Sequence, residues 1–382
     1  MKITIIGSTK PDYELSVEEA VKLAGRSAGI CYMKDTYAEL CEEDPERTVK
    51  RANGTIKRHH HSVWGHATYN ILLEGIPKIL AMILNNEQDY NTSEKSARYT
   101  EMEPSEGEGI LYYKWIEILK EEIAKCYPKF DEDKVKTLAQ ENARYMLSVF
   151  TPATTMLYTC TIQQWNYIMY WSEQYIKNGP EDDFSNRVKQ VLRDFLESKP
   201  AINVEGLNTE MKNRTFSLFA KRNNRAEHFG ETYCTSYMGT FAQLAQAQRH
   251  RTLDYEMFIP GEKTFFTPPI LEYTSYEKEW KIDIASLKDN YPQGMMVLIN
   301  ERGTCEKFVL KCTERLCGCA QLEIMRQTIK TFGKYLAAVK TTNSDVYNYL
   351  EPYSHGPRCT FPGWVCEKPC IFGGSKAFKR EV

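Results

Sequence analysis

The sequence predicts an α/β (α+β) protein of two tandem domains, each a small sheet packed with long helices, which together form a pseudo-dimer. Three observations predict this fold class. Strand-like segments alternate with helical segments along the chain, and one order of elements occurs twice. The length of 382 residues also suits two domains, at roughly 100–200 residues each.

In the first half, apolar runs predict strands and apolar residues three or four positions apart predict helices. The chain order is strand 2–7, helices 16–26 and 46–58, a strand-like stretch 65–74, helices 75–85, 110–126 and 133–148, a buried strand 155–161 and an aromatic-rich helix 162–177. Pro152 separates the long helices from the buried strand, because proline interrupts a helix.

A polar stretch from about 178 to 212 separates the two halves. It contains Gly179-Pro180 and Pro200, which are typical of a linker, and one helix over 184–197. We therefore predict a first domain over 1–180, a linker region over 181–212 and a second domain over 213–382. The second half repeats the plan in shorter form: strand 230–238, helix 239–251, strand 294–299, helical 303–340 and an irregular tail rich in Pro, Gly and Cys.

An internal repeat supports this division. Residues 65–90 and 230–255 are segments of equal length that start with Gly, end in Asp-Tyr and change from strand-like to helical at the same place. A strand followed by a long helix comes after each segment, at 155–177 and at 294–327. We interpret this pattern as a tandem duplication whose halves have diverged.

Composition excludes several classes of protein. The formal net charge is −2, which argues against a nucleic-acid protein that works by bulk positive charge. No apolar run approaches the length of a membrane span, and the N-terminus has no signal-peptide pattern, so we expect a cytoplasmic protein without membrane contact. Its twelve cysteines should then be mostly reduced.

Two clusters of polar residues suit anions. Arg249-His250-Arg251 ends a predicted helix, and its guanidinium groups match phosphate oxygens; the alternative is a solvated basic helix end. Ser96 and Arg98 could grip a phosphate from one turn; the alternative is a capped loop with a surface arginine.

Metal binding is not predicted at either of two further clusters. The run from His59 to His61 lacks an Asp, Glu or Cys at a ligand spacing beside it. The tail cysteines Cys359, Cys366 and Cys370 do not have a standard zinc spacing.

Taken together, these clusters resemble motifs of the flavin-dependent thymidylate synthases. The first half matches this family's upstream His-x-Ser segment, its Glu-x-Ser-x-Arg-Tyr loop and its Ala-Arg-x-x-Leu segment, at His60–His66, Glu94–Tyr99 and Ala143–Leu147. The second half matches the family's Arg-His-Arg at a helix end, at Arg249–Arg251, together with the glutamine three residues before it, Gln246. It also matches the family's late helix, at Arg315 and Ala320–Ile324.

The two halves have lost complementary parts of the family pattern. Where Arg-His-Arg would stand, the first half reads Leu84-Asn85-Asn86-Glu87, and Gly65 replaces an acidic residue of the upstream segment. The second half has no Ser-x-Arg-Tyr. Members of the family are homotetramers with active sites between subunits, so a fused pair needs each half-site once. We infer a composite working site, and we expect the other pairing of half-sites to be empty.

The resemblance implies methylation of dUMP to dTMP, with methylenetetrahydrofolate and NADPH as co-substrates and FAD as cofactor. It assigns dUMP to Glu94, Ser96, Arg98, Arg144, Gln246, Arg249 and Arg315, and FAD to His60, Ser62, Arg249, His250 and Arg251. Arg315 and Ser96 are the candidate catalytic residues. It also implies a homodimer that forms a pseudo-tetramer of four domains. Two alternatives stay open: a related enzyme that hydroxymethylates a pyrimidine nucleotide, and a non-catalytic homologue that binds nucleotide or flavin.

Overall fold

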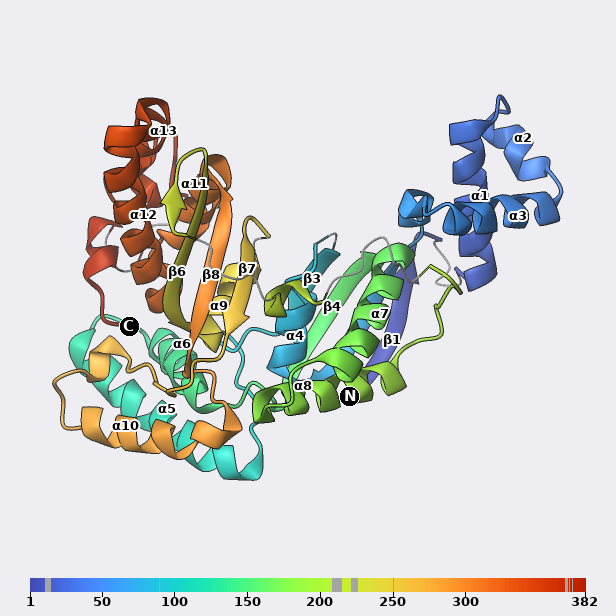
Figure 1. Ribbon diagram of the computed structural model, residues 1–382. Coiled ribbons are helices and arrows are strands. Elements are labelled where there is room, and N and C mark those ends of the chain that lie inside the picture. Colours follow the sequence, from blue (N-terminus) through green and yellow to red (C-terminus); the bar gives the residue numbers. More distant parts are fainter. Residues whose placement is uncertain are drawn as a thin grey trace. The chain divides into compact units, whose positions relative to one another are not determined.

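The computed structural model describes residues 1–10, 15–88, 90–207, 215–220, 226–249, 251–367, 370, 372 and 374–382 (Figure 1). Two four-stranded antiparallel sheets and many helices make up these residues, which confirms the predicted α/β fold class. None of the helices in the described ranges combines the length and the apolar character needed to cross a membrane.

The chain divides into two compact units, each formed by segments that are not continuous in sequence. Unit 1 contains residues 1–95 and 152–217, and unit 2 contains residues 96–151 and 218–382. A 3-10 turn, η4 (Ser217–Phe219), contains the last residue of unit 1 and the first of the second segment of unit 2. The domain boundaries predicted at residues 180 and 213 follow the repeat along the sequence and not these two units. They stay a prediction.

Unit 1 is built on the sheet β1 (Lys2–Ser8), β2 (Thr68–Ile76), β4 (Thr154–Thr161) and β3 (Tyr90–Glu94), in that spatial order. Side chains alternate between the two faces of a strand, and Ile71 pairs with Tyr158 in a fully buried layer. The helices are α1 (Val17–Tyr32), α2 (Tyr37–Glu42), α3 (Pro45–Lys57), the 3-10 helix η1 (His61–His66), α4 (Lys78–Leu84), α7 (Ile162–Asn178) and α8 (Asp183–Ser198).

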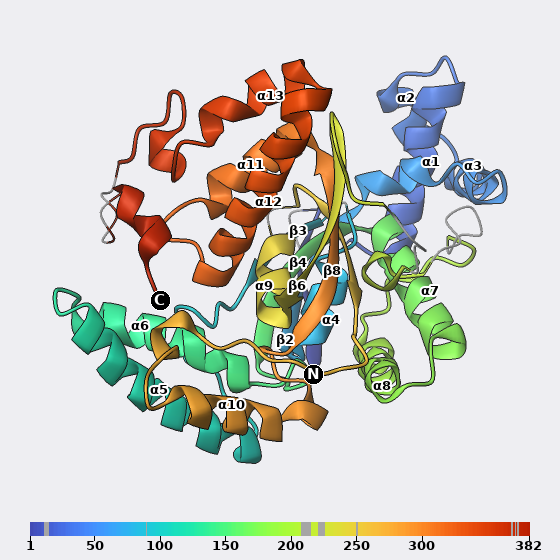
Figure 2. The same cartoon turned by 60° about the vertical axis from the view of Figure 1, so that its left-hand side comes forward.

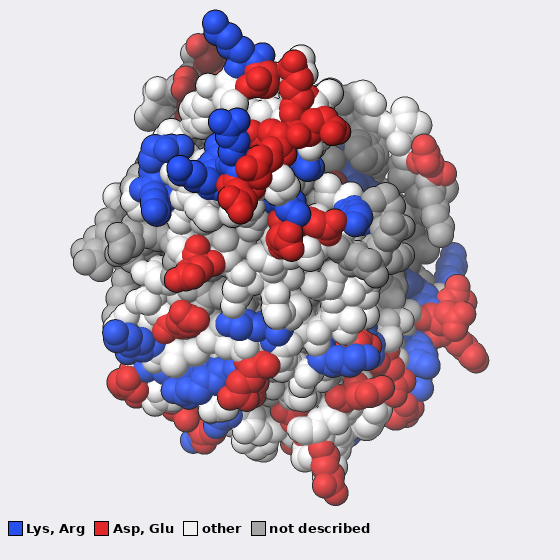
Figure 3. All heavy atoms as spheres, turned by 90° about the vertical axis from the view of Figure 1, so that its right-hand side faces the viewer, with Lys and Arg blue, Asp and Glu red and all other residues white. Residues whose placement is uncertain are grey.

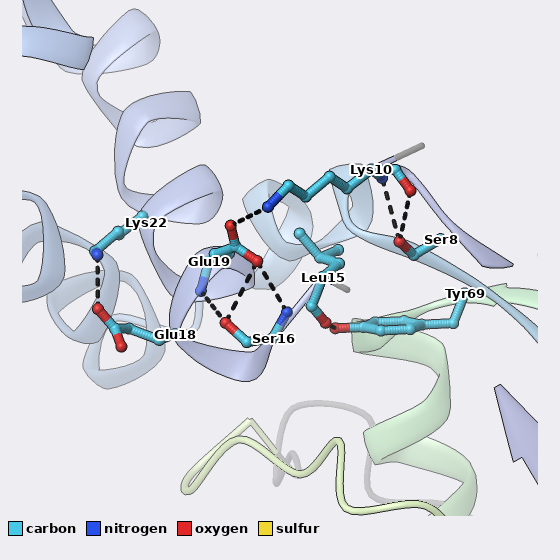
Figure 4. A network of polar contacts seen from close by, with 8 residues as sticks. All are labelled: Ser8, Lys10, Leu15, Ser16, Glu18, Glu19, Lys22 and Tyr69. Atoms are coloured by element: carbon cyan, nitrogen blue, oxygen red, sulfur yellow. Dashed lines mark hydrogen bonds and ion pairs between the residues drawn. The ribbon is translucent and has the colours of Figure 1, made fainter. Parts of the chain in front are cut away.

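A polar network fixes the start of α1 (Figure 4). Ser16 and Glu19 form a reciprocal capping box, in which the Glu19 backbone N–H donates to Ser16 Oγ and the Ser16 backbone N–H donates to Glu19 Oε2. Lys10 Nζ lies 2.8 Å from Glu19 Oε1, and Tyr69 Oη donates to the Leu15 carbonyl. These contacts join α1 to the end of β1 and to β2.

Unit 2 is built on the sheet β5 (His228–Phe229), β6 (Thr232–Thr240), β8 (Met296–Thr304) and β7 (Asp254–Phe258), in that spatial order. Its helices are α5 (Glu106–Cys126), α6 (Glu132–Ala143), α9 (Phe241–Gln248), α10 (Glu277–Ser286), α11 (Cys305–Arg315), α12 (Leu322–Thr342) and α13 (Ser344–Leu350). Short 3-10 turns are η2 (Arg144–Met146), η5 (Pro269–Leu271), η6 (Lys288–Asn290), η7 (Glu351–Tyr353), η8 (Arg358–Thr360) and η9 (Gly374–Lys379).

The segment 96–151 packs against the second half of the chain within unit 2. Figure 2 shows α5, α6 and α10 side by side. The Trp115 ring on α5 meets the Trp280 ring on α10 edge-on, with centroids 4.8 Å apart, and Trp115 Nε1 donates to Asp283. Tyr145 Oη donates to the buried Glu323 on α12 at 3.0 Å. Buried aromatic pairs of this kind hold segments that are far apart in sequence.

The two sheets have the same connectivity. In each, the spatial order is first, second, fourth and third strand, and a helix joins the second strand to the third: β2–α4–β3 in unit 1 and β6–α9–β7 in unit 2. This agreement is consistent with the predicted tandem duplication.

Several elements differ from the sequence-based expectations. The predicted helix 133–148 ends at Ala143, because Arg144–Met146 form a 3-10 turn and Leu147 is extended. The predicted helical stretch 303–340 is two helices, since residues 316–321 leave the helix between α11 and α12. Strands β3 and β7 were not predicted, because each has only five residues; pairing with β4 and β8 decides their conformation.

A buried ion pair attaches α11 to the sheet of unit 2. Lys311 Nζ lies 2.5 Å from Glu301 Oε2 on β8, and both side chains are almost completely buried. The Tyr233 and Tyr237 hydroxyls donate to the same carboxylate at 2.7 and 2.8 Å. Arg315 follows one helical turn after Lys311, so this pair also fixes where Arg315 stands.

Candidate functional site

Ser96 and Arg98 lie on one turn directly after β3. The Ser96 carbonyl accepts hydrogen bonds from the backbone N–H groups of Tyr99 and Thr100, and Ser96 Oγ accepts one from the Arg98 backbone N–H at 3.3 Å. The turn therefore holds a hydroxyl and a guanidinium two residues apart at the start of unit 2.

The Arg98 guanidinium is fixed from two sides. Its Nε lies 2.8 Å from the carboxylate of Glu141 on α6, and its Nη2 donates to the Cys319 carbonyl at 2.5 Å. Cys319 lies in the loop between α11 and α12. Arg98 thus joins its own turn to α6 and to the segment that follows Arg315.

Arg144 is a buried cation with unused donors. Its side chain stands on the 3-10 turn that follows α6, the residue is 5% exposed, and its Nε and Nη2 have no hydrogen-bond partner among the described residues. Buried donors without partners are costly and rare in folded proteins. Their presence on a guanidinium indicates a place for an anionic ligand.

Glu141 balances part of this positive charge. Burial by itself would raise the pKa of its carboxyl, but the charges of Arg98 and Arg144 outweigh burial and hold that pKa below its usual range. One carboxylate therefore faces two guanidinium groups. Sequence reasoning missed Glu141, although it precedes Arg144 by three residues at the end of a helix, a spacing that puts both on one side.

Arg315 ends α11 and lies close to the other arginines of unit 2. It is 6% exposed, and its Nη2 donates to the Gln246 carbonyl on α9. Burial, with added repulsion from Arg98 and Arg249, lowers the pKa of Arg315 to about 10. Its guanidinium stays charged at neutral pH. The buried Oε1 of Gln246 accepts no hydrogen bond in the part of the chain that is described.

Arg249 and Arg251 follow α9, which ends at Gln248 and is therefore shorter than the predicted helix 239–251. Arg249 continues from the last helical residue in right-handed helical conformation, and Arg251 has a left-handed backbone, with φ of 51°. The Arg251 backbone N–H donates to the Gln248 carbonyl at 3.1 Å. His250 lies outside the described residues.

Glu94, by contrast, is engaged inside unit 1. It is 8% exposed, forms an ion pair with Lys78, and accepts a hydrogen bond from Asn85 Nδ2 at 3.1 Å. Asn86 Nδ2 donates to Ser217 Oγ at 2.7 Å. The asparagines that stand where the family has Arg-His-Arg therefore serve contacts within unit 1. A role for Glu94 in dUMP binding stays a prediction.

His60 and Ser62 are exposed around η1 in unit 1. His60 Nδ1 lies 2.5 Å from Tyr32 Oη, whereas the neighbouring His61 is buried and its Nδ1 lies 3.0 Å from Tyr167 Oη. Within the described ranges, His, Cys, Asp and Glu side chains form no group of three that could hold a metal ion.

A basic groove of unit 1 contains none of the predicted site residues. It lies along α3, has a volume of about 930 Å³ and includes Lys22, Arg47, Lys50 and Lys57 in its lining. On the face drawn in Figure 3, however, basic and acidic side chains are mixed. The buried arginines of unit 2 are therefore the better candidate site.

A comparison with models of protein families finds a match over part of the chain. Residues 12–171 match the family model described as Thy1, thymidylate synthase complementing protein. The predicted resemblance to the flavin-dependent thymidylate synthases is thereby confirmed over this stretch. It includes the Glu-x-Ser-x-Arg-Tyr and Ala-Arg segments.

Two solved structures of the flavin-dependent thymidylate synthase ThyX from Helicobacter pylori, each with FAD and dUMP, are similar to part of the chain. One is 14% identical, with 52% of this chain and 94% of the other covered and a TM-score of 0.30. The second is 13% identical, with 53% and 95% covered and a TM-score of 0.32. A search of curated proteins finds no match.

Proposed function

We propose that this protein is a flavin-dependent thymidylate synthase, which methylates dUMP to dTMP with methylenetetrahydrofolate as carbon donor and with FAD reduced by NADPH. The family match over residues 12–171 supports the class of enzyme. The proposal places the working site in unit 2, at a cluster of arginines drawn from both halves of the chain.

One observation carries this proposal. Arg98 and Arg144 come from the first half of the sequence and Arg315 from the second, yet all three belong to unit 2. The charge of Arg98 depresses the pKa of Arg315, as repulsion between neighbouring cations does. A group of three guanidinium groups, of which Arg144 has two buried donors without a partner among the described residues, suits a ligand that carries a dianionic phosphate.

On this proposal, Ser96, Arg98 and Arg144 bind the phosphate of dUMP. Arg144 offers two donors that have no partner in the described part of the chain, and Glu141 keeps Arg98 oriented before the nucleotide arrives. A guanidinium held by a carboxylate needs less ordering when it meets its ligand, which favours binding.

Arg315 and Gln246 face the base in this proposal. The Gln246 amide oxygen, buried without a partner in the described part of the protein, can accept a hydrogen bond from an N–H group of uracil. The charged Arg315 stabilises negative charge on a pyrimidine carbonyl oxygen while C5 attacks the incoming carbon. Its pKa of about 10 leaves it protonated throughout the neutral range.

The residues that follow α9 fit a diphosphate. Arg249 and Arg251 supply two cations within three residues, and guanidinium groups bind phosphate oxygens in pairs. We assign FAD to Arg249, His250 and Arg251 of unit 2, and a role for His60 and Ser62 in binding FAD stays a prediction. When bound, FAD supplies the redox chemistry, and the protein orients it and excludes competing reactions.

Assembly and location remain proposals of the same kind. We propose a homodimer that forms a pseudo-tetramer of four domains, with the pairing of the two degenerate half-sites left empty. Asn85 and Asn86 make their hydrogen bonds within unit 1, which supports the proposal that the degenerate half-sites bind no ligand. We also propose a cytoplasmic location.

Anaerobic turnover tests the function directly. The full chain, dUMP, methylenetetrahydrofolate and NADPH should yield dTMP, and the purified protein should show a flavin absorbance band. A colourless protein that forms 5-hydroxymethyl-dUMP would favour the hydroxymethylating alternative. A protein that binds dUMP or flavin and turns over neither substrate would be the non-catalytic homologue.

We expect Arg98→Ala to raise the KM for dUMP by about tenfold or more, because hydrogen bonds to charged groups contribute about 1.5–3 kcal/mol each. The turnover number should change less, since the phosphate is remote from the reacting carbon. Steady-state kinetics with varied dUMP measures both. The matched control is Glu141→Gln, which keeps the Arg98 guanidinium. If both variants raised the KM equally, the loss of the ion pair between Arg98 and Glu141 would explain the effect, and Arg98 would not bind the phosphate directly.

We expect Arg249→Ala to weaken FAD binding by more than about 1.5 kcal/mol, because it removes charge-assisted hydrogen bonds to a phosphate. Fluorescence titration of the apoprotein with FAD gives the dissociation constant. Asn86→Ala, at the corresponding place of the first half, should leave that constant unchanged. Equal losses for both variants would contradict the division of labour between the two halves.

A further inference from the structure

Three thiols meet at the loop between α11 and α12, next to the arginine cluster. Cys317 and Cys319 flank Gly318, and the Cys319 backbone N–H donates to Cys317 Sγ at 3.5 Å. Cys370 Sγ lies against the same glycine, because a β-carbon built on Gly318 would overlap that sulfur. Glycine at this position is thus required for the close approach of the third thiol.

The backbone of this loop is held on both sides by guanidinium groups. Arg380 Nη1 donates to the Gly318 carbonyl at 2.7 Å, and its Nη2 donates to the Ala320 carbonyl. Arg98 Nη2 donates to the Cys319 carbonyl at 2.5 Å. Cys319 is exposed and Cys317 half-buried, so a small molecule from solvent can reach the pair.

The surroundings favour a thiolate at Cys317. The hydrogen bond from the Cys319 thiol is the main cause, and the Cys319 backbone N–H and the charges of Arg358 and Arg380 add to it; against the effect of burial, they lower the pKa of Cys317 to about 5. The hydrogen bond between the two thiols raises the pKa of Cys319, and burial and the neighbouring Cys370 raise it further. The charge of Lys134 on α6 offsets part of this rise.

Other cysteines of the chain have the opposite surroundings. Cys160 on β4 and Cys312 on α11 are fully buried, and burial raises the pKa of both thiols far above the usual range. Buried thiols of this kind are inert. The loop between α11 and α12 therefore combines what a reactive pair needs: access, a short spacing and positive neighbours.

We propose that Cys317 and Cys319 form a redox-active dithiol site whose substrate is a small-molecule disulfide. Cys317 is the attacking thiolate and Cys319 the resolving thiol. Nothing in the proposed thymidylate synthesis requires this pair, so the site is a separate activity of unit 2.

The exchange balances without a further reagent. The Cys317 thiolate attacks one sulfur of the small disulfide, whose S–S bond breaks, and one small thiolate leaves. Cys319 then loses its proton, and its thiolate attacks Cys317 Sγ in the mixed disulfide, so the second small thiolate leaves. The two protein thiols are oxidised to one disulfide, the small disulfide is reduced to two thiols, and the two protons end on the released thiols.

The site adjoins the nucleotide residues through Arg98. A Cys317–Cys319 bond closes a tight ring around Gly318 and changes the loop whose carbonyl orients Arg98. We expect the oxidised form to bind dUMP several-fold more weakly than the reduced form in isothermal titration. This consequence rests on the proposed function, whereas the thiol chemistry does not. Failure of dUMP to bind the reduced protein would count against the proposed function alone.

Differential alkylation of the full, reduced chain tests the dithiol in the presence of a chelator. At pH 5.5 an ordinary thiol with a pKa near 8.5 is only about one part in a thousand thiolate, whereas the lowered pKa of Cys317 gives it a larger thiolate fraction. The weaker nucleophilicity of a low-pKa thiolate offsets part of this advantage. We expect iodoacetamide to modify Cys317 about tenfold faster than the exposed Cys31, and the rate at Cys317 to fall as pH drops through about 5.

Equilibration with reduced and oxidised glutathione then identifies the bond. Trypsin releases Leu316–Arg326 as one peptide that contains both cysteines, so an internal disulfide lowers the mass of that single peptide by one H₂. In Cys319→Ser, Cys317 should stop at the mixed disulfide with glutathione. Cys31→Ser should behave like the unaltered chain.

Three results would overturn the proposal. The first is alkylation of Cys317 at pH 5.5 no faster than that of Cys31. The second is an oxidised chain whose Leu316–Arg326 peptide keeps two free thiols. The third is a link that joins this peptide to the one that contains Cys370, because Cys319 would then not be the resolving thiol.

Discussion

Replacing Arg315 by alanine is expected to lower the turnover number for dTMP formation by about 100-fold or more. Removing one preorganised group that faces developing negative charge costs about 10²–10³ in turnover in comparable sites. Arg315 is buried, its Nη2 is anchored on the Gln246 carbonyl, and it keeps its proton below a pKa of about 10. These properties suit a fixed positive charge at the pyrimidine.

The pH profile adds a second readout for Arg315. Because its pKa is lowered to about 10, the charge is complete through the neutral range and is lost only as pH rises through that value. The turnover number should therefore fall at high pH in the unaltered enzyme, and Arg315→Lys should recover part of the loss seen with alanine.

Stopped-flow or steady-state kinetics at saturating dUMP measures the effect. Lys281→Ala, which breaks the exposed pair with Glu277, is the matched surface control and should leave turnover unchanged. A turnover number for Arg315→Ala within threefold of the unaltered enzyme would remove Arg315 from the catalytic role.

Lys311→Met is expected to destabilise unit 2 by about 3–5 kcal/mol, because removing one partner of a buried ion pair leaves an uncompensated buried charge. Glu301 would keep its hydrogen bonds from the Tyr233 and Tyr237 hydroxyls but lose its cation. Urea denaturation, followed by circular dichroism, reports the shift in the midpoint of unfolding.

The double variant Lys311→Met with Glu301→Gln makes this prediction specific. A neutral amide oxygen can still accept from the tyrosine hydroxyls, so most of the lost stability should return. Lys281→Met on the surface should shift the midpoint little. A midpoint for Lys311→Met equal to that of the surface variant would mean that the pair contributes nothing to stability.

Much of the local structure could be predicted from the sequence. Hydrophobic spacing located β2, β4, β6 and β8 and most of the long helices, since these elements have a strong pattern of their own. The resemblance to the flavin-dependent thymidylate synthases was visible in short motifs and is confirmed over residues 12–171. The weakly patterned strands β3 and β7 were missed, because a partner strand rather than their own residues decides their conformation.

The grouping of the arginines could not be predicted. The resemblance to family motifs singles out Arg98, Arg144 and Arg315 along the chain. Sequence spacing does not say which distant segments pack together. Burial of Trp115 against Trp280 and of Tyr145 against Glu323 places residues 96–151 with 218–382.

The sequence by itself therefore determined the fold class, the strong helices and strands and the residue types available for binding phosphate. Only the tertiary structure decided that Glu94 is engaged by Lys78 and Asn85 in unit 1, and that Glu141 and the Cys319 carbonyl hold Arg98 in unit 2. The physical reason is that local pattern follows from neighbouring residues. Contacts across 200 positions follow from which buried surfaces and charges satisfy one another.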